Sequence, residues 1–411
     1  MNVLLIGNGF DLYYNLPTKY ANFLHTVDFL INNYSNEMKS VGDVFSQEVL
    51  QNEDSFIKEC YSIHKSAFDA TVLDAKRIEY LIEIVKDNEW FTYLLKSYNK
   101  DVGWIDFEKE IAFVIERFDQ MILPDSKTLH YGSKYSKVNK NILSIFNYFV
   151  ELIRKSNYVT VGSTEVKQEF LVEEHLGSGE LVVDKKKVID YLVDKLETLS
   201  RALAIYLECF IESVCDLISR EHNYRRIGLF SLIDYVVNFN YTNTYEKLYS
   251  KSSIFHIHGN INDSIVLGIN PNVSDELVSV DTSFIKFKKY FQRTFYETDY
   301  EYIRWMSELK HNNEDFRLVT MGHSLDVTDK DIILELFENA NEIIILYHDK
   351  QAKFSYISRL VELFGKDGFD SLRKEKQLTF LPLNKEFYEL EKKIENENWN
   401  KILEPIVAQC I

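Results

Sequence analysis

The chain contains 411 residues, of which 45% are hydrophobic and 14% aromatic, a composition that excludes a wholly disordered protein and allows a large core. Its 14 glycines and 5 prolines are few for this length, which argues against a turn-rich β-sandwich and for long helices. The 64 acidic and 47 basic residues give a net charge of −17, the wrong sign for binding nucleic-acid phosphates over a broad face. We therefore expect no nucleic-acid partner, and only a local basic groove is left open.

The cysteines and the apolar runs bear on the compartment. The four cysteines show neither CxxC pairs nor the cysteine and histidine spacing of a zinc site, so no structural metal or disulfide scaffold is expected. The apolar start of the chain breaks at Gly7, too early for a signal peptide. No apolar run approaches the roughly 18 residues that cross a bilayer. We therefore expect a cytoplasmic protein without a membrane partner.

The first elements are a strand, a glycine turn and a helix. Val3–Ile6 is a continuous apolar run, typical of a buried parallel strand, and the turn Gly7–Gly9 follows at once. Thr18 is a candidate cap for a helix whose apolar stripe covers residues 20–31.

The middle of the chain, from about residue 40 to residue 225, has helical apolar periodicity almost throughout. One buried stripe runs over residues 104–118, and the longest helix is predicted from Asp184 to about Glu221. Residues 156–183 alternate polar residues around Gly-Ser-Gly and predict an exposed excursion or a small hairpin. We interpret the block as a large all-helical insertion.

After residue 230 short β-rich runs are separated by helical stretches. These runs are Tyr235–Val237, Ile254–His258, Ile265–Leu267, Leu318–Met321 and Ile343–Leu346. Strands that alternate with helices form parallel βαβ units, so we predict an α/β fold with a doubly wound, mostly parallel sheet. The predicted domains are a sheet domain, residues 1–40 plus 226–411, and the helical insertion, residues 41–225.

The turn Gly7-Asn8-Gly9-Phe10-Asp11 comes directly after the first strand, where open α/β sheets bind ligands. Two glycines let the backbone approach a phosphate, and backbone N–H groups at the strand end face the crevice. A bare GxG is a weak signal, and a plain strand-to-helix turn has the same pattern. Both interpretations remain open at this point.

Polar residues also follow the later strands. Asn238–Thr242 brings amide and hydroxyl groups to the same edge, or forms a turn that caps the next helix. In His256–Gly259, strand alternation predicts both imidazoles on one face. No third metal ligand lies near these histidines in the sequence, which favours a general base or a core histidine over a metal site. Gly322–Asp326 is the fourth polar segment, and Glu108 begins a helix, where the helix dipole favours a carboxylate even without catalysis.

These segments together, with Leu16-Pro17-Thr18 behind the first turn, resemble the bacterial phage abortive-infection family AbiH. The match lies at the two ends of the chain rather than in the helical middle. That family is linked to defence in which an infected cell stops growing or dies before phage is released. The resemblance implies a phage-defence protein with a phage-derived trigger.

The same order of motifs is similar to the sirtuin nucleotide fold, in which a GAG turn, a Gln-Asn pair, a His-Gly and a Gly-Thr-Ser-Leu strand end surround NAD. Pro17 falls ten residues after Gly7, as in sirtuins, and Asn240 precedes His258 by 18 residues, near the sirtuin interval. The resemblance implies a Rossmann-like, sirtuin-like sheet with NAD as ligand or substrate. Tyr20 stands in place of a sirtuin arginine and the zinc cysteines are missing, so protein deacylation is not expected.

The resemblance also implies roles for individual residues. Gly7 and Gly9 would face the pyrophosphate, and Ser324 would contact the adenosine phosphate or ribose. The candidate nucleotide-binding residues are Gly7, Asn8, Gly9, Phe10, Thr242, Gly322 and Ser324. The candidate catalytic residues are Asn240, His258 and Asp11.

Cleavage of the glycosidic bond of NAD needs an oriented water, a base and a site that stabilises an oxocarbenium-like ribose. In this hypothesis Asn240 orients the water, His258 accepts a proton and Asp11 stabilises the positive charge. One alternative is a nucleotide sensor without catalysis, and another is a nuclease that uses Asp11, Glu108, His256 and His258 around a metal. The aromatic-rich insertion is a candidate surface for homo-oligomer formation or trigger recognition.

Overall fold

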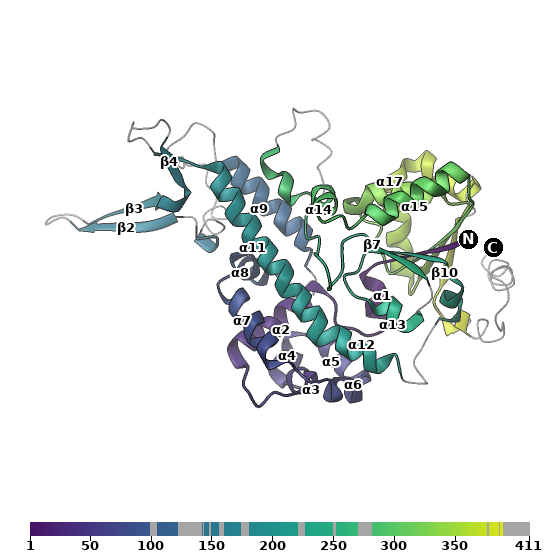
Figure 1. The fold of residues 1–411 in the computed structure, drawn as a ribbon, viewed down its shortest axis with the longest axis horizontal. Helices are drawn as coiled ribbons and strands as arrows, with labels where there is room; N and C mark the ends of the chain where they lie inside the picture. The colour runs from purple at the N-terminus through teal and green to yellow at the C-terminus, as the bar shows by residue number, and fades with distance from the viewer. Residues whose placement is uncertain are drawn as a thin grey trace.

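The computed structural model of the chain describes residues 1–98, 105–121, 142, 144–147, 149–155, 160–173, 181–220, 227–249, 252–269, 282–375, 378–385 and 387–388. A six-stranded sheet with its helices lies at one end of the molecule, and a block of helices lies at the other (Figure 1). The long helix α11 (Lys185–Tyr206) crosses the helical block, and the N-terminal strand belongs to the sheet.

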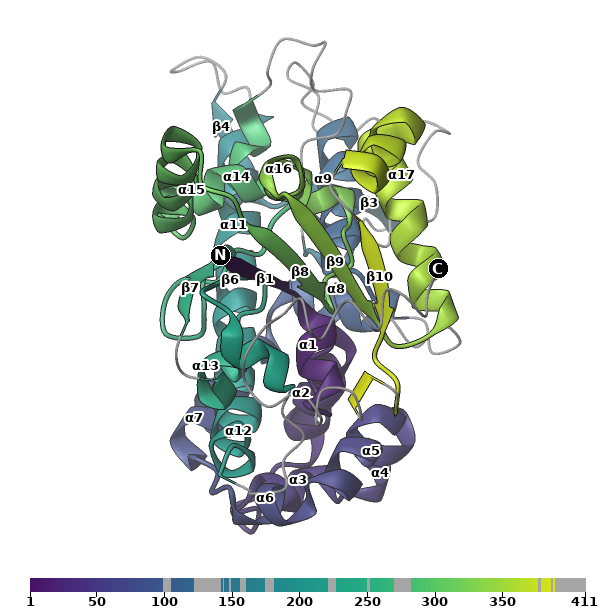
Figure 2. The same cartoon turned by 90° about the vertical axis from the view of Figure 1, so that its right-hand side faces the viewer.

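All six strands of the sheet are parallel, which confirms the predicted α/β fold with a parallel sheet. The strands are β1 (Asn2–Ile6), β6 (Tyr235–Asn238), β7 (Ser253–His256), β8 (Arg317–Met321), β9 (Glu342–Tyr347) and β10 (Thr379–Pro382). Their spatial order is β10-β9-β8-β1-β6-β7 (Figure 2). The chain moves outward from β1 to β7 and then returns to β8 on the other side of β1. The direction of winding therefore reverses between β1 and β8.

Within the six-stranded sheet, one predicted strand is wrong and one strand was not predicted. Ile265–Leu267 is an irregular buried segment, because its backbone bonds go to a turn and to side chains rather than to a neighbouring strand. The Val266 amide donates to the His258 carbonyl, and its own carbonyl accepts from the Tyr241 hydroxyl. A short apolar run cannot distinguish such a segment from a buried strand. Strand β10 escaped prediction because four residues ending in proline carry almost no periodicity.

The helices form two groups along the chain. Those before β6 are α1 (Asn8–Tyr13), α2 (Tyr20–Asn33), α3 (Val41–Phe45), α4 (Glu48–Glu53), α5 (Ser55–Ile63), α6 (Lys65–Ala70), α7 (Ala75–Lys86), α8 (Glu89–Ser97), α9 (Phe107–Met121), α11 (Lys185–Tyr206) and α12 (Ser213–Ile218). Those after β6 are α13 (Thr244–Tyr249), α14 (Lys289–Tyr296), α15 (Tyr300–Asn312), α16 (Lys330–Asn339) and α17 (Lys350–Glu375). The 3₁₀ helices are η1 (Gln168–Phe170), η3 (Gly228–Leu232), η5 (Thr282–Phe287) and η6 (Val327–Asp329).

The longest predicted helix is present but not uniform. Asp184 caps α11 by accepting from the Lys187 amide, as expected at a helix start. A π-helical turn, η2 (Leu207–Glu212), joins α11 to α12. The predicted end near Glu221 lies outside the described residues. At α2 the predicted cap is wrong, because Lys19 occupies the capping position and the Thr18 hydroxyl donates to Asn8.

The middle block is not entirely helical, which corrects the predicted all-helical insertion. Strand β2 (Phe149–Lys155) pairs antiparallel with β3 (Thr160–Val166), and this hairpin projects from the block (Figure 1). A second pair joins β4 (Leu171–Glu173) to β5 (Leu181–Val183). Polar alternation predicted a hairpin only from residue 156 onward. The strand over residues 149–155 was missed because its apolar residues also fit a helical stripe.

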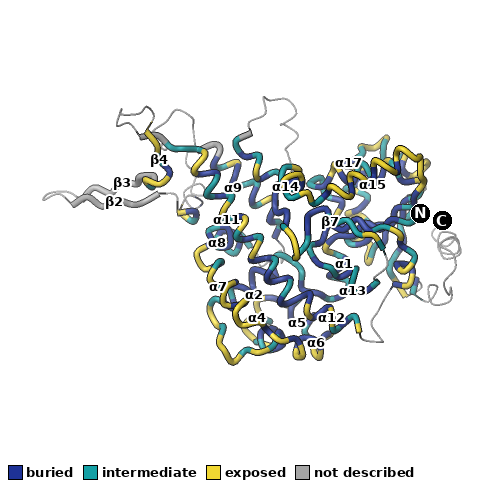
Figure 3. The backbone as a smooth tube through the Cα atoms, in the orientation of Figure 1, coloured by how far each residue is buried: buried dark blue, intermediate teal, exposed yellow. Residues whose placement is uncertain are grey.

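Each face of the sheet has its own core. On β1, Leu4 and Ile6 belong to the cluster that continues into the helical block, whereas Val3 and Leu5 face α15, α16 and α17. This alternation follows from the two-residue period of a strand. One cluster of buried residues extends from the sheet into the helical block, and buried segments occur in both parts of the molecule (Figure 3). The domain boundaries drawn from the sequence remain a prediction.

Within the described part of the chain, none of the helices is both long enough and apolar enough to cross a membrane.

Candidate functional site

Four predicted polar segments follow neighbouring strands at the carboxyl edge of the sheet. The register pairs Ile6 with both Asn238 and Met321, and Asn238 with His256. The residues that follow these four positions therefore leave the sheet at the same edge (Figure 2). Open parallel sheets bind their ligands at this edge, next to the point where the winding reverses.

Asn240 ties two of these strand ends together. Its side-chain amide donates to the Gly7 carbonyl over 3.0 Å, and its backbone amide donates to Oδ1 of Asn238 over 2.8 Å. The side chain is only 7% exposed. The bond to Gly7 uses one of the two N–H groups of this amide and fixes its orientation, and the side-chain oxygen Oδ1 can accept a hydrogen bond from a water or a hydroxyl.

The glycine turn packs tightly against the turn after β8. The Gly9 amide donates to the Gly322 carbonyl over 2.8 Å. A Cβ on Gly7 would lie 2.8 Å from the His323 Cα, and one on Gly9 would lie 2.7 Å from the Gly322 Cα. Gly322 itself has φ of +70°, which favours glycine. These glycines allow two backbone turns to touch, and the expected contact of Gly7 and Gly9 with a pyrophosphate stays a prediction.

The predicted nucleotide-binding side chains differ in accessibility. Phe10 is fully buried, its ring packs against those of Tyr14, Phe230 and Tyr245, and its backbone amide donates to the Gly7 carbonyl, so its expected contact with a nucleotide stays a prediction. Asn8 and Ser324, by contrast, are exposed at the edge.

Thr242 is buried, and its hydroxyl donates to Oδ2 of Asp11 over 2.6 Å. Burial raises the pKa of Asp11 from 3.8 to about 7, although the Thr242 bond opposes the rise, and the negative charges of Glu212 and Glu246 add to it. No contact joins Asp11 to His258 among the residues that the structure describes. The two predicted catalytic groups therefore lie in separate clusters.

His258 lies in a buried charged cluster, which we call the Asp329 cluster and which consists of His258, Asp329, Lys289 and Glu108. The His258 Nε2 is 3.0 Å from Oδ1 of Asp329, a close contact that is not aligned as a hydrogen bond. The Lys289 Nζ lies 2.8 Å from the same oxygen and 2.8 Å from Oε1 of Glu108. Four charged or titratable groups from four elements thus meet beside the sheet edge.

The cluster sets the protonation state of its members. Burial, and then the positive charge of Lys289, lowers the pKa of His258 to about 4, so the ring is neutral at pH 7. Asp329 is also desolvated, but Lys289 and His258 hold its pKa well below the usual range. Burial raises the pKa of Glu108 to about 7, against the opposing attraction of Lys289. A carboxylate beside Nε2 favours the neutral ring with its proton on Nε2, which leaves Nδ1 as the basic atom.

His323 and Phe239 complete this side of the edge. The His323 Nδ1 accepts from the Leu325 amide over 3.0 Å, and its Nε2 is 3.6 Å from Oδ2 of Asp329. The Phe239 ring packs against both histidines, His258 and His323. Leu325 has φ of +53°, a strained conformation for a residue with a side chain.

The two histidines of the His-Ile-His segment do not share a face, so that prediction is wrong. Strand β7 ends at His256, and the turn that follows carries His258 away from the alternating pattern. The His256 Nε2 contacts Glu246 over 2.6 Å, whereas His258 contacts Asp329. Across the described residues no group of three or more histidine, cysteine, aspartate or glutamate side chains has a metal-binding arrangement, so Asp11, Glu108, His256 and His258 do not form one metal set.

Comparison with known proteins identifies the family. A family model described as bacteriophage abortive infection AbiH matches residues 3–348. The chain belongs to the AbiH family. The match covers most of the chain, including the helical middle, which the sequence resemblance had left out. No curated protein and no solved structure matches the chain. AbiH membership connects the protein to abortive-infection defence against phage.

Two members of the Asp329 cluster were not predicted in this AbiH chain. Asp329 precedes α16, where an acidic residue is typical of an ordinary helix start. Lys289 is one of three lysines within four residues, Lys286, Lys288 and Lys289, where a solvated side chain is the usual interpretation. Glu108 was considered, but only as a second choice after a helix-dipole role. Such long-range ion pairs carry no local sequence pattern.

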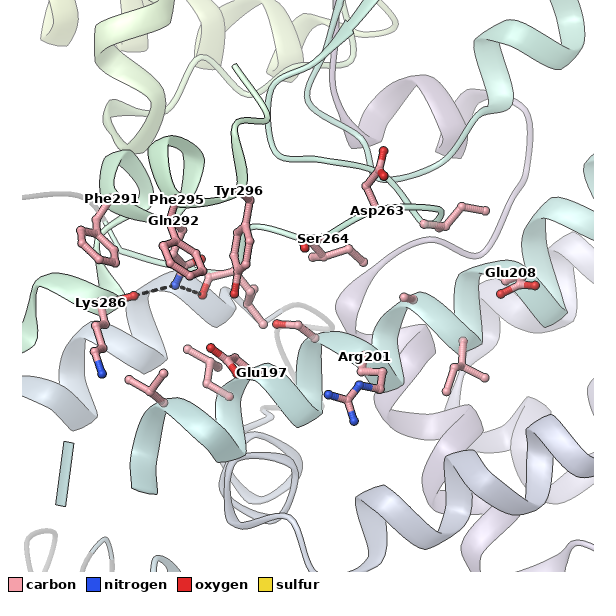
Figure 4. Close-up of a pocket in the computed structure, with 18 of the residues that line it drawn as sticks. Glu197, Arg201, Glu208, Asp263, Ser264, Lys286, Phe291, Gln292, Phe295 and Tyr296 are labelled. Atoms are coloured by element: carbon pink, nitrogen blue, oxygen red, sulfur yellow. Dashed lines mark hydrogen bonds between the residues drawn. The ribbon is translucent and has the colours of Figure 1, made fainter. Parts of the chain in front are cut away.

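A cavity of about 550 Å³ lies between α11, α14 and the segment over residues 261–267, and no member of the Asp329 cluster lines it. The rings of Phe291, Phe295 and Tyr296 project from α14 on one side, and Glu197 projects from α11 on the other (Figure 4). None of the candidate catalytic residues lines this cavity. Its size is that of an ordinary small-molecule site.

Proposed function

We propose that the protein acts in phage defence by cleaving the nicotinamide glycosidic bond of NAD or a related nucleotide. The Rossmann-like order of the strands supports a nucleotide at the carboxyl edge. Counted along the chain, the strands lie in the order 3-2-1-4-5-6, the order of doubly wound sheets that bind dinucleotides. Sirtuin-like NAD binding is part of this proposal.

The observation that carries the proposal is a buried, neutral histidine beside an ionised carboxylate at this edge. His258 is 5% exposed and its pKa is about 4, so the ring is neutral and its unprotonated nitrogen, Nδ1, can accept a proton at neutral pH. Asp329 stabilises the imidazolium that forms, as the carboxylate does in a histidine–aspartate pair. The side-chain oxygen Oδ1 of Asn240 can orient a water or a ribose hydroxyl, because the bond from the same side chain to Gly7 fixes the amide.

The reaction balances without a metal or a redox partner. Water adds through its oxygen to C1′ of the nicotinamide ribose, the bond from C1′ to the ring nitrogen breaks, and nicotinamide leaves with the electron pair. His258 accepts the proton that the water releases. The products are nicotinamide and ADP-ribose when NAD is the substrate. Asn8 and Ser324, which are exposed, are available to the phosphate and adenosine portion.

In this proposal Asp329, and not Asp11 as the sequence suggested, is the carboxylate that stabilises the positive charge developing on the ribose. Asp11 is half ionised near pH 7 and has no contact with His258 among the described residues, whereas Asp329 is ionised and 3.0 Å from it. Asp329 is therefore the nearer source of negative charge. Asp11 keeps a supporting role in holding the β1 turn through Thr242.

The test is chromatography of NAD after incubation with purified protein, with and without EDTA. Production of nicotinamide and ADP-ribose, unaffected by EDTA, is the expected result. His258→Ala and Asn240→Ala should each lower the rate by about 10²- to 10⁴-fold, the usual contribution of a general base or an oriented reactant. Circular dichroism should show that both variants fold. Full activity in both variants would contradict the proposal.

A second candidate function, a nucleotide sensor without turnover, is favoured by the separate cavity. Its wall, the segment over residues 261–267, is bonded to His258 through the Val266 amide, so a ligand there lies close to the sheet edge. Calorimetry with NAD distinguishes the two functions. Binding without turnover would select the sensor if Phe295→Ala abolished it and Tyr290→Ala did not. Tyr290 is an exposed residue of the same helix and does not line the cavity.

A further inference from the structure

Lys289 joins the helical block to the sheet. It is the first residue of α14, its side chain is 1% exposed, and its Nζ lies 2.8 Å from one carboxylate on each side. Glu108 comes from the first turn of α9, and Asp329 from the start of α16. Helices α9 and α14 lie next to each other in Figure 1, consistent with this contact.

The position of Lys289 is electrostatically unfavourable except for its two partners. A cation at a helix N-terminus faces the positive end of the helix dipole, whereas both carboxylates lie at helix starts, where the dipole favours them. Burying a lone ammonium without a partner is strongly unfavourable. The two carboxylates together offset this cost, and they raise the pKa of Lys289 above its usual value.

Asp329 alone would not fix the lysine. Its Oδ1 is shared by the Lys289 ammonium and the His258 ring, which lie 2.8 Å and 3.0 Å away. Without Glu108 as a second anchor, the ammonium is free to move relative to the Asp329 carboxylate. Such a movement changes the contact of Asp329 with His258. Glu108 supplies that anchor from another helix, α9, with Oε1 2.8 Å from the Lys289 Nζ.

We propose that Glu108 is a positioning residue of the site, which acts through Lys289 to hold Asp329 beside His258. This inference rests on the proposed function of His258 as the base. Glu108 belongs to the helical block and does not touch His258, so its effect on the site passes through Lys289. The helical block is then a part of the catalytic unit. A purely structural bridge between the two regions would stabilise the fold and leave His258 unaffected.

The variants keep or remove the anchor. Glu108→Ala removes the acceptor, whereas Glu108→Gln keeps an oxygen that can accept from Lys289. Glu110→Ala is the matched control, since Glu110 lies on the same helix, is also half-buried and accepts from the Tyr93 hydroxyl away from the cluster. We expect Glu108→Ala to lower kcat by about 10- to 100-fold with KM within threefold, Glu108→Gln to restore most of the loss, and Glu110→Ala to match wild type.

A second readout does not depend on NAD cleavage. In protein labelled at its histidine ring nitrogens, NMR reports the tautomer of His258, assigned by comparison with His258→Gln. Wild type, Glu108→Gln and Glu110→Ala should show the proton on Nε2, and Glu108→Ala a mixture of tautomers. An unchanged tautomer in folded Glu108→Ala would overturn the proposal. A changed tautomer in a protein that never cleaves NAD would support the positioning role and contradict only the proposed function.

Discussion

Asp11 and Asp329 are two buried aspartates at the same edge of the same sheet, and their environments give them opposite properties. Burial and the negative charges of nearby carboxylates raise the pKa of Asp11 to about 7, although the hydrogen bond from the Thr242 hydroxyl opposes this rise. Asp329 contacts an ammonium and an imidazole, so its pKa falls well below the usual range. Burial is common to both, and the charge of the partner decides which one carries a permanent negative charge.

The largest effect should come from removing the cation on which Asp329 depends. Lys289→Met leaves two buried carboxylates facing each other, and breaking such an arrangement should cost about 3 to 5 kcal/mol of unfolding free energy. Urea denaturation measures it. Lys286→Met is the control, because Lys286 is exposed and pairs with Asp190 on the surface, and it should change stability by less than about 1 kcal/mol. A loss below 1 kcal/mol in Lys289→Met would remove the contrast between the two aspartates.

The second effect concerns the pH dependence that Asp11 imposes. Between pH 3.8, where the unfolded carboxyl titrates, and about 7, the folded protein holds a proton that the unfolded chain has released. The unfolding free energy therefore falls as the pH rises through this window. Asp11→Asn removes that slope, so the stability of the variant relative to wild type should increase by about 2 to 3 kcal/mol from pH 5 to pH 8.

The control for this pH dependence is Asp184→Asn, since asparagine also serves as an N-cap at this half-buried helix start. Its stability relative to wild type should vary little over the same range. A parallel pH dependence of wild type and Asp11→Asn would show that Asp11 has an ordinary pKa.

A smaller effect should follow from removing the hydroxyl that serves Asp11. Thr242→Val deletes the 2.6 Å bond to Oδ2 and should cost about 1 to 2 kcal/mol at pH 8, with a smaller loss at pH 5, where the carboxyl is neutral. Thr294→Val, which loses only a bond to a carbonyl of its own exposed helix turn, is the comparison. An equal loss at both pH values would mean that Thr242 supports packing rather than the charge of Asp11.

The smallest effect should come from the hydroxyl of Tyr20, a residue of α2 that contacts α9. Tyr20 stacks on Phe107 with ring centroids 4.0 Å apart, and its hydroxyl is 3.4 Å from that of Tyr241. Tyr20→Phe keeps the stacking and loses only a long hydrogen bond, so it should cost less than about 1 kcal/mol in a denaturation experiment. A loss above 2 kcal/mol would assign the hydroxyl a larger role in the site.

The sequence predicted the sheet and its polar edge for a physical reason. Parallel strands all end at one edge, so the polar residues after Ile6, Asn238 and Met321 had to meet there once the strands were recognised. The bond between Asn240 and Gly7 is a consequence of that arrangement. The same reasoning failed at His258, because a turn replaces the last residues of the predicted strand.

The charged cluster could not be predicted in the same way. Glu108 and Lys289 are separated by 181 positions and Lys289 and Asp329 by 40, and no periodicity connects them. Each has an ordinary explanation in its own segment, as a helix start or a solvated lysine. Only the packing of α9 against α14 brings them together, and that packing depends on long-range contacts that a single sequence does not reveal.

The central claim is tested most directly by the NAD content of cells that carry this protein and are infected with a phage it blocks. Cells with the wild-type chain should lose NAD and accumulate nicotinamide before phage is released, while cells with His258→Ala at equal protein level should keep their NAD and lose protection. Protection by the wild-type chain with an unchanged NAD content would contradict the account.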